Sequence, residues 1–144
     1  MRGSDAGKKV KGRKRHILVD TRGLLLAVVV TSAAVSDPAG ARLLLRRLAG
    51  GCKKLRRMWV DGTSRGQVLA WVRRHLPFVL QPVLRSDDQK GVVVLPRRWV
   101  VERTFGWLTQ CRRLGKDYEG LVASSEALIY IAMTRFMLRR LAAS

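Results

Sequence analysis

Two apolar stretches near the start of the chain have the pattern of a β-hairpin. Residues 17–19 (Ile-Leu-Val) and residues 24–31 are rich in Val and Leu, and Asp-Thr-Arg-Gly at residues 20–23 separates them. Asp and Gly favour turns, and an uninterrupted aliphatic run favours a buried strand. The pattern therefore predicts an antiparallel hairpin whose second strand is buried.

Helical and strand-like patterns alternate after the hairpin. Ser36-Asp37-Pro38 is typical of a helix start, and Gly50-Gly51 of a helix end. We then predict a strand over residues 55–60, a helix over residues 64–75 and a strand over residues 78–84. Because Pro82 removes a backbone donor, this last strand should lie at a sheet edge.

The final third of the chain has two helical patterns. The first begins at Pro96 or Arg97 and runs to about Arg113. The second runs from Ser124 or Ser125 to Leu141, with a Ser as the N-cap and Glu126 in the first turn, where the helix dipole favours an acid. Its apolar stripe consists of Ile129, Ala132, Met133, Phe136 and Met137. The whole order of elements predicts an α/β protein.

The charge balance points to a polyanionic partner. The 144 residues include 29 Lys or Arg and only 10 Asp or Glu, for a formal net charge of +19, while 47% of the residues are hydrophobic. That apolar content is enough for one domain with a core, and nucleic acid is the commonest polyanion bound by such basic domains. The longest apolar run, residues 24–30, is too short to cross a membrane. We therefore expect a cytoplasmic protein that binds nucleic acid and has no membrane partner.

Much of the charge lies at the N-terminus. Residues 1–16 combine Gly and Ser with many basic residues and lack apolar content for a core. We therefore expect residues 1–16 to form a flexible basic arm, followed by a folded domain over residues 17–144. The basic residues expected to contact DNA in this arm are Lys8, Lys9, Lys11, Arg13 and Lys14.

Two of the few acids stand out by position. Asp61 follows the strand-like Met58-Trp59-Val60, where α/β folds place ligands, and a carboxylate suits Mg²⁺. The alternative is an Asx turn at Asp61-Gly62. Glu102 shares a helical stripe with Arg98 and Gly106, and a Gly inside a helix is costly unless something approaches closely. The alternative for Glu102 is a surface ion pair with Arg98.

These segments resemble the DDE-class transposases of bacterial insertion sequences. The resemblance is carried by the hairpin region (residues 8–23), by Trp-Val-Asp-Gly (residues 59–62) and by Arg-Arg-Trp-Val-Val-Glu-Arg-Thr-Phe-Gly-Trp-Leu (residues 97–108). Tyr-Glu at residues 118–119 and residues 125–130 continue it. The spacing Arg-x-x-x-Glu is the most specific part.

The resemblance implies an RNase H-like mixed sheet with flanking helices. It also implies three carboxylates that hold two Mg²⁺ or Mn²⁺ ions for DNA cleavage and joining. Asp61 matches the second catalytic Asp and Glu102 the catalytic Glu, so both are expected to be metal ligands. Arg98, Arg112 and Arg113 are expected to contact DNA, and the family allows a dimer on DNA.

The chain departs from the family pattern at its start. The strand that carries the first catalytic Asp has no counterpart, and neither Asp5 nor Asp20 is a convincing substitute, since Asp20 lies in the hairpin turn. Thr109 occupies the usual Lys position. We therefore expect a truncated RNase H-like catalytic domain that binds DNA but is inactive alone, with the edge of the first hairpin strand unpaired.

Two alternatives stay open. One is a DNA-binding remnant with no catalytic role. The other is a basic RNA-associated protein, which would expose aromatic side chains for stacking on bases. We expect the four tryptophans to be core residues instead, and they are Trp59, Trp71, Trp99 and Trp107.

Overall fold

The computed structural model describes residues 3–5, 10–49, 51, 55–61, 66–83 and 96–144. The strands are β1 (Gly3–Asp5), β2 (Val10–Val19), β3 (Leu25–Ser32), β4 (Arg57–Asp61) and β5 (Val79–Val83). The helices are α1 (Asp37–Ala49), α2 (Gln67–His75), α3 (Pro96–Thr109) and α4 (Val122–Ala142). The predicted mixed α/β class is confirmed.

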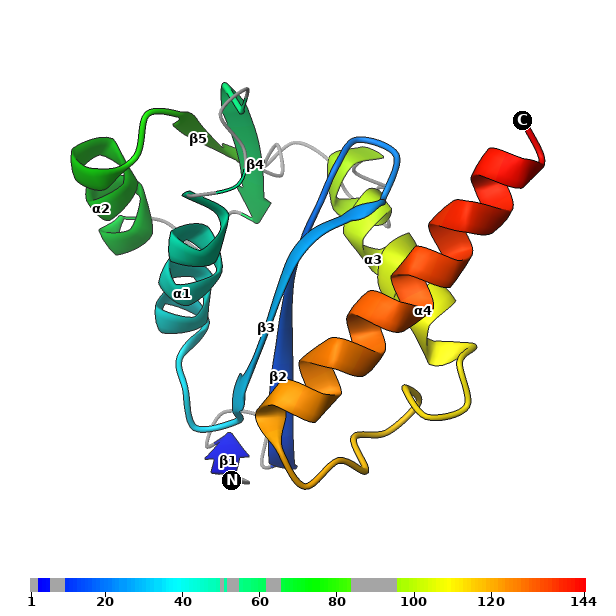
Figure 1. Ribbon diagram of the computed structural model, residues 1–144. Coiled ribbons are helices and arrows are strands. Elements are labelled where there is room, and N and C mark those ends of the chain that lie inside the picture. The colour runs from blue at the N-terminus through cyan, green and yellow to red at the C-terminus, as the bar shows by residue number, and fades with distance from the viewer. Residues whose placement is uncertain (1–2, 6–9, 50, 52–54, 62–65, 84–95) are drawn as a thin grey trace, which may run out of the picture.

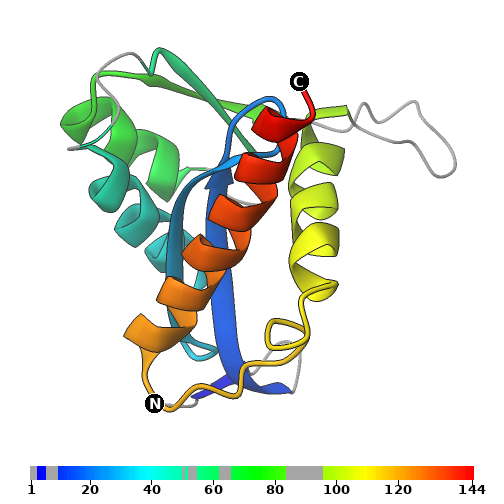
Figure 2. The same ribbon diagram turned by 45° about the vertical axis from the view of Figure 1, so that its right-hand side comes forward.

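The strands of the described residues form two sheets. β1, β2 and β3 form an antiparallel sheet in that order, and β4 and β5 form a parallel pair. Figures 1 and 2 show the β2–β3 hairpin between α1 on one side and the pair α3 and α4 on the other. The first sheet therefore has helices on both of its faces.

β3 is buried on both faces, which accounts for its uninterrupted apolar sequence. Val28 and Val30 pack in one core cluster with Leu108 of α3 and with Ile129 and Met133 of α4. Ala27 and Val29, which alternate with them, pack against Leu44 of α1. Because successive strand residues point to opposite faces, each helix layer contacts alternate residues of the same strand.

The β4–β5 pair has a core of its own, next to α1 and α2. Met58, Leu80 and Phe78 pack there with Val68 and Val72 of α2. Leu18 of β2 packs against this cluster and also against the Ala27–Val29–Leu44 cluster, so it links the two parts of the fold.

Most predicted elements are confirmed. The predicted hairpin matches β2 and β3, the Ser36 and Gly50 signals bracket α1, and Pro82 lies in β5, which pairs with β4 alone among the described strands. Asp20 is structural as expected: its Oδ1 accepts hydrogen bonds from the backbone N–H groups of Arg22 and Leu24, at 2.8 and 2.9 Å.

Four predictions are wrong. Residues 10–16 do not form a flexible arm, because they are part of β2 and pair with β1 and β3. Ser125 does not cap α4, which begins at Val122; its side chain is buried and donates to Asp117. Trp99 is not a core residue, since 46% of it is exposed. In addition, α3 ends at Thr109 rather than at Arg113.

Within the described residues, no helix is both long enough and apolar enough to span a membrane.

Candidate nucleic-acid and metal-binding residues

The helix that carries Glu102 is held against the hairpin turn. Thr104 is fully buried, and its hydroxyl donates to the carbonyl oxygen of Gly23 at 2.7 Å. Arg103 donates from Nη2 to the carbonyl oxygen of Arg22, also at 2.7 Å. Gly23 has φ +86°, and a Cβ there would lie 2.8 Å from Thr104 Oγ1, so only Gly fits this approach. These contacts hold the part of α3 around Glu102 against the hairpin turn.

Aromatic rings and arginines line another side of α3. The guanidinium of Arg103 lies 4.8 Å from the ring centroid of Trp99 and 4.9 Å from that of Trp107. Trp107 also stacks on Phe136 of α4, with centroids 4.3 Å apart. Cation–π contacts at i, i+4 and i+8 therefore stiffen the helix face next to Glu102. They also explain how Trp99 is held in place although it is half exposed.

The two predicted metal ligands come from separate elements. Glu102 lies in the middle of α3 with its side chain exposed, and Asp61 is the last residue of β4. The side chains of Asp61 and of the predicted DNA contact Arg98 lie outside the described part of the structure. Among the described residues, no group of three or more His, Cys, Asp or Glu is placed to hold a metal ion. Whether Asp61 and Glu102 share a metal ion therefore stays a prediction.

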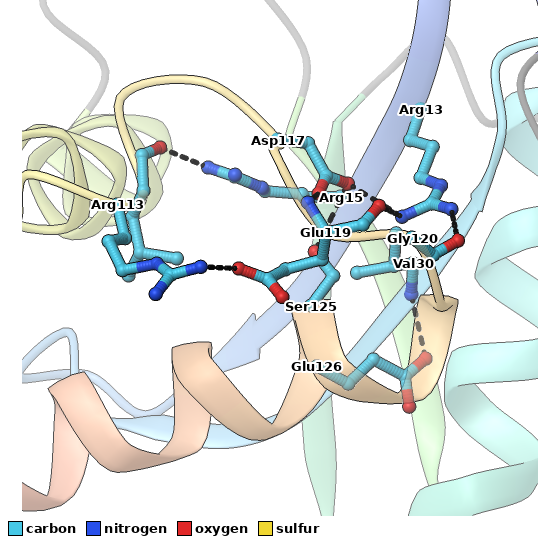
Figure 3. Close-up of polar contacts among 10 residues, drawn as sticks. Arg13, Arg15, Val30, Arg113, Asp117, Glu119, Gly120, Ser125 and Glu126 are labelled. Carbon is cyan, nitrogen blue, oxygen red and sulfur yellow. Dashed lines mark hydrogen bonds and ion pairs between the residues drawn. The ribbon is translucent and has the colours of Figure 1, made fainter.

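Of the predicted DNA contacts in the N-terminal segment, Arg13 has a different role. Its side chain is only 4% exposed and forms an ion pair with Asp117, with 3.3 Å between Nη1 and Oδ2. Its guanidinium also donates to the carbonyl oxygens of Glu119 and Gly120, at 2.9 and 2.7 Å (Figure 3). Arg13 is therefore committed to holding the loop between α3 and α4, and the expectation that it contacts DNA is not supported.

The loop between α3 and α4 is a network around Asp117. Besides Arg13, this carboxylate accepts hydrogen bonds from the Ser125 hydroxyl and the Glu119 backbone N–H, both at 3.1 Å (Figure 3). Arg15 donates to the carbonyl oxygen of Leu114 at 2.6 Å. Sequence reasoning missed this network because its partners lie about 100 residues apart and share no local pattern.

The other residues predicted to bind DNA differ in how exposed their side chains are and in whether they form ion pairs. Lys8 and Lys9 lie outside the described residues, and only the backbone of Lys11 is described. Lys14 pairs with Asp37 at 3.2 Å, and Arg113 pairs with Glu119 at 2.7 Å while its side chain stays 69% exposed. Arg112 is exposed. Among the predicted contacts whose side chains are described, Arg112 and Arg113 are the ones left accessible.

Side chains from two helices cover the outer edge of β3. The Val30 N–H donates to Glu126 Oε1 at 2.9 Å, and the Val28 N–H donates to Tyr130 Oη at 3.2 Å. Arg47 of α1 donates to the Val28 carbonyl oxygen at 2.7 Å and pairs with Glu126 at 2.6 Å. The hydrogen bond to Glu126 raises the pKa of Arg47. Glu126 therefore serves the strand edge, not the start of α4 as its position in the sequence suggests.

Comparison with known proteins identifies the family. The family model described as "Transposase DDE domain" matches residues 1–137, nearly the whole chain. The chain belongs to the DDE transposase family. This confirms the resemblance carried by the hairpin, by residues 59–62 and by the Arg-x-x-x-Glu spacing, and it assigns the chain to the proteins of DNA transposition.

A curated relative agrees with this assignment. The chain is 34% identical over 116 residues to a protein of Burkholderia cepacia named "Putative transposase for insertion sequence element IS402". The match covers 75% of this chain and 54% of that protein, so the chain spans about half the length of the relative. No solved structure matches the chain.

Proposed function

We propose that this chain is a DNA-binding portion of the catalytic domain of an insertion-sequence transposase, and that it does not cut DNA by itself. In this proposal the folded part of the chain, which includes all of β2 (Val10–Val19), has an RNase H-like arrangement. Asp61 and Glu102 are two of its three metal-binding carboxylates. The family match supports the class of reaction, and the observation that carries the proposal is the placement of Glu102: exposed, on a helix held to the hairpin by Thr104 and Arg103.

The chemistry of the donor set fits a loosely held Mg²⁺ or Mn²⁺ ion. Mg²⁺ is usually bound through one or two carboxylates and keeps several waters. Asp61 and Glu102 would supply those carboxylates, and a bound ion would supply electrostatic stabilisation of a phosphate. Two-metal strand cleavage needs two ions about 4 Å apart, which two carboxylates hold poorly. We therefore propose that the chain is inactive alone, because Asp61 and Glu102 supply only two carboxylates for two metal ions.

The edge of β2 that faces away from β3 is where we propose that a further strand pairs. β1 pairs with β2 only at residues 10–12, with Gly3 opposite Gly12 in an antiparallel register. Within the described strands, residues 15–19 of β2 pair with β3 alone. Because Gly3 lies beside Ser32 and Ala34 at the end of β3, the added strand would be a segment other than β1, paired along residues 15–19 on the edge of β2 that faces away from β3. We propose that the first strand of the RNase H-like fold, with the third carboxylate, belongs at this edge.

The opposite edge of the same sheet is closed to such an addition. Glu126, Tyr130 and Arg47 already bind the outward backbone groups of Val28 and Val30. An unpaired strand edge invites pairing with another segment, and side chains that bind its backbone prevent it. The difference between the two edges favours strand addition at β2.

The DNA-binding part of the proposal is tested by salt-dependent binding to a duplex. We expect the affinity to fall roughly a thousandfold or more between 50 and 200 mM salt if the chain contacts on the order of six to ten phosphates. Arg112→Gln should lower the affinity and reduce the salt slope by about one, and Arg112→Lys should restore both. A nearly flat salt dependence would refute DNA binding. Tighter binding to single-stranded RNA than to duplex DNA would favour the RNA-associated alternative.

The catalytic assignment has a separate test. Mg²⁺ binding, followed by the chemical shift of the Trp99 and Trp107 indole N–H groups in NMR, should be lost in Glu102→Gln. The substitution Glu119→Gln, on the α3–α4 loop, is the matched control and should leave the titration unchanged. If Glu102→Gln titrates like the wild type, Glu102 is not a metal ligand and the DNA-binding remnant becomes the better description.

A further inference from the structure

A groove lies between the end of α3, with the residues that follow it to Leu114, and the middle of α4. Its volume is about 590 Å³, within the range of roughly 300–1,000 Å³ typical of binding pockets. Trp107, Leu128, Ala132 and Phe136 supply its apolar lining, and all four are half-buried. We call it the α3–α4 groove. An apolar occupant would remove the apolar surface of this lining from water, and the groove therefore favours such an occupant.

The charged residues of the groove are all arginines: Arg112, Arg113, Arg135 and Arg139. Arg113 is paired with Glu119. Within the described part of the chain, Arg112, Arg135 and Arg139 form no ion pair, and all three are exposed. The groove therefore combines an apolar lining with a basic rim in which Arg112, Arg135 and Arg139 form no ion pair with a described carboxylate.

An apolar stripe on α4 continues the groove. Ile131, which lines the groove, is 64% exposed, and Leu138 is 60% exposed. They lie seven residues apart, two helical turns or about 10 Å along α4, and therefore on the same side of the helix. Large apolar side chains exposed in a row, with a polar rim, are typical of a protein-interaction site.

We propose that the α3–α4 groove binds an acidic amphipathic helix of a protein partner. Leucine-like side chains at positions i, i+3 or i+4, and i+7 would occupy the apolar lining and contact Ile131. Flanking carboxylates would pair with Arg112, Arg135 and Arg139. This is the helix-in-groove mode of recognition, in which the apolar stripe supplies affinity and the charges set the orientation.

Other occupants fit less well. A second copy of this chain would bring the same arginines together, and like charges at an interface cost affinity. Duplex DNA would pair with the arginines but would leave Ile131 and the apolar lining without an apolar partner. The combination of both features therefore selects a partner that is acidic and apolar on neighbouring faces.

The test uses a designed peptide in a solution that contains no DNA. A labelled peptide of about 20 residues, long enough to form a helix, carries Leu at i, i+3, i+4 and i+7 and mostly Glu elsewhere. A scrambled peptide of the same composition has no stripe. Fluorescence anisotropy should show the patterned peptide binding at least about tenfold more tightly than the scrambled one, because only the patterned peptide buries its apolar side chains together.

Matched variants locate the site. Ile131→Ser should weaken peptide binding about tenfold and Arg135→Gln by about fivefold. Leu121→Ser and Arg74→Gln change residues that are also exposed but lie outside the groove, and they should change binding less than about twofold. All four positions are exposed, so the fold should persist, which circular dichroism checks.

Three results would overturn the inference. The first is equal affinity for the patterned and scrambled peptides, which would indicate nonspecific charge attraction. The second is an equal effect of groove and control variants. The third is a groove variant that weakens duplex DNA binding while leaving the peptide unaffected, which would make the groove a DNA contact. Because the peptide assay contains no DNA, failure of DNA binding by the chain would leave its result intact.

Discussion

Arg13 on β2 and Asp117 on the loop between α3 and α4 form an ion pair of 3.3 Å between residues 104 positions apart. Only 4% of the Arg13 side chain and 16% of the Asp117 side chain are exposed. The pair (Figure 3) therefore fastens the start of α4 to the first long strand, at the end of the sheet opposite the hairpin turn (Figure 1). α3 is held at the other end by Thr104 and Gly23.

We expect Arg13→Gln to destabilise the fold by about 2–4 kcal/mol, since removal of one partner leaves Asp117 as a largely buried charge without its cation. Urea denaturation followed by circular dichroism measures this. The control is Arg113→Gln, which breaks an ion pair whose arginine is 69% exposed and should cost less than about 1 kcal/mol. Similar small losses in both variants would mean that the Arg13–Asp117 pair does not fasten the loop.

Substitution by Ala should destabilise the fold at one helical glycine and stabilise it at another. A Cβ at Gly40 of α1 would overlap the imidazole ring of His16, whereas a Cβ at Gly106 of α3 would meet no atom of the described residues within 4 Å. Gly40→Ala should therefore cost about 1–3 kcal/mol through overpacking. Gly106→Ala should stabilise by about 0.5–1 kcal/mol through helix propensity.

Gly106 also bears on the proposed function. If DNA approaches α3 closely at this position, Gly106→Ala should weaken duplex binding although it stabilises the free protein. Thermal melting and duplex binding measured on the same variant separate the two effects. A variant that is more stable and binds DNA as well as the wild type would show that Gly106 makes no close approach to DNA.

The local elements were predictable because their signals are local. The turn chemistry of residues 20–23, Pro38 at the start of α1 and the apolar run of β3 each specify structure within a few residues. The start of β2 was not predictable in this way. Val10–His16 has a basic, Gly-containing sequence with no strand pattern, and it is a strand because Arg13 and Arg15 bind the loop between α3 and α4.

The same reasoning explains the mixed outcome at the candidate site. The hairpin region, residues 59–62 and the Arg-x-x-x-Glu spacing together were sufficient to find the family, and the last of them placed Glu102 on a helix. It could not show that Arg13 is an internal cation or that Glu126 binds the backbone of β3, because both roles depend on contacts about 100 residues away. In a chain with ten acids and 29 basic residues, sequence alone does not show which arginine is paired.

The covered edge of β3 gives a further prediction. Glu126→Leu should cost about 2–3 kcal/mol, because the Val30 N–H loses its acceptor and Arg47 loses its carboxylate. Tyr130→Phe removes only the acceptor of the Val28 N–H and should cost about 0.5–1.5 kcal/mol. An uncovered strand edge promotes pairing between molecules, so light scattering should detect association in Glu126→Leu. A monomeric Glu126→Leu variant with unchanged stability would contradict this role of Glu126.

His16 should make stability depend on pH. Burial lowers its pKa from 6.5, outweighing the nearby Asp37, and its Nε2 lies 3.0 Å from Thr31 Oγ1. The unfolded chain therefore binds a proton at a higher pH than the folded chain does. The contribution of His16 to the free energy of unfolding is therefore complete above the pKa that His16 has in the unfolded chain, and it falls as the pH drops below about 6.5. Melting temperatures from pH 7.5 to 5 should fall more in the wild type than in His16→Gln, and parallel curves would contradict the assignment.

The last prediction concerns strand cleavage. With Mg²⁺ or Mn²⁺, the chain alone should not nick a supercoiled plasmid or a duplex that carries transposon ends, because Asp61 and Glu102 are too few to hold two ions about 4 Å apart. Agarose gels of the plasmid over several hours measure this, with a duplex-binding assay on the same sample to show that the protein is folded and binds DNA. Metal-dependent nicking that disappears in Glu102→Ala would contradict the prediction. Such activity would require a third carboxylate, and the variants Asp5→Asn and Asp20→Asn would then show which acid supplies it. Asp20→Asn is also expected to lose folding, because the Asp20 carboxylate accepts hydrogen bonds in the hairpin turn.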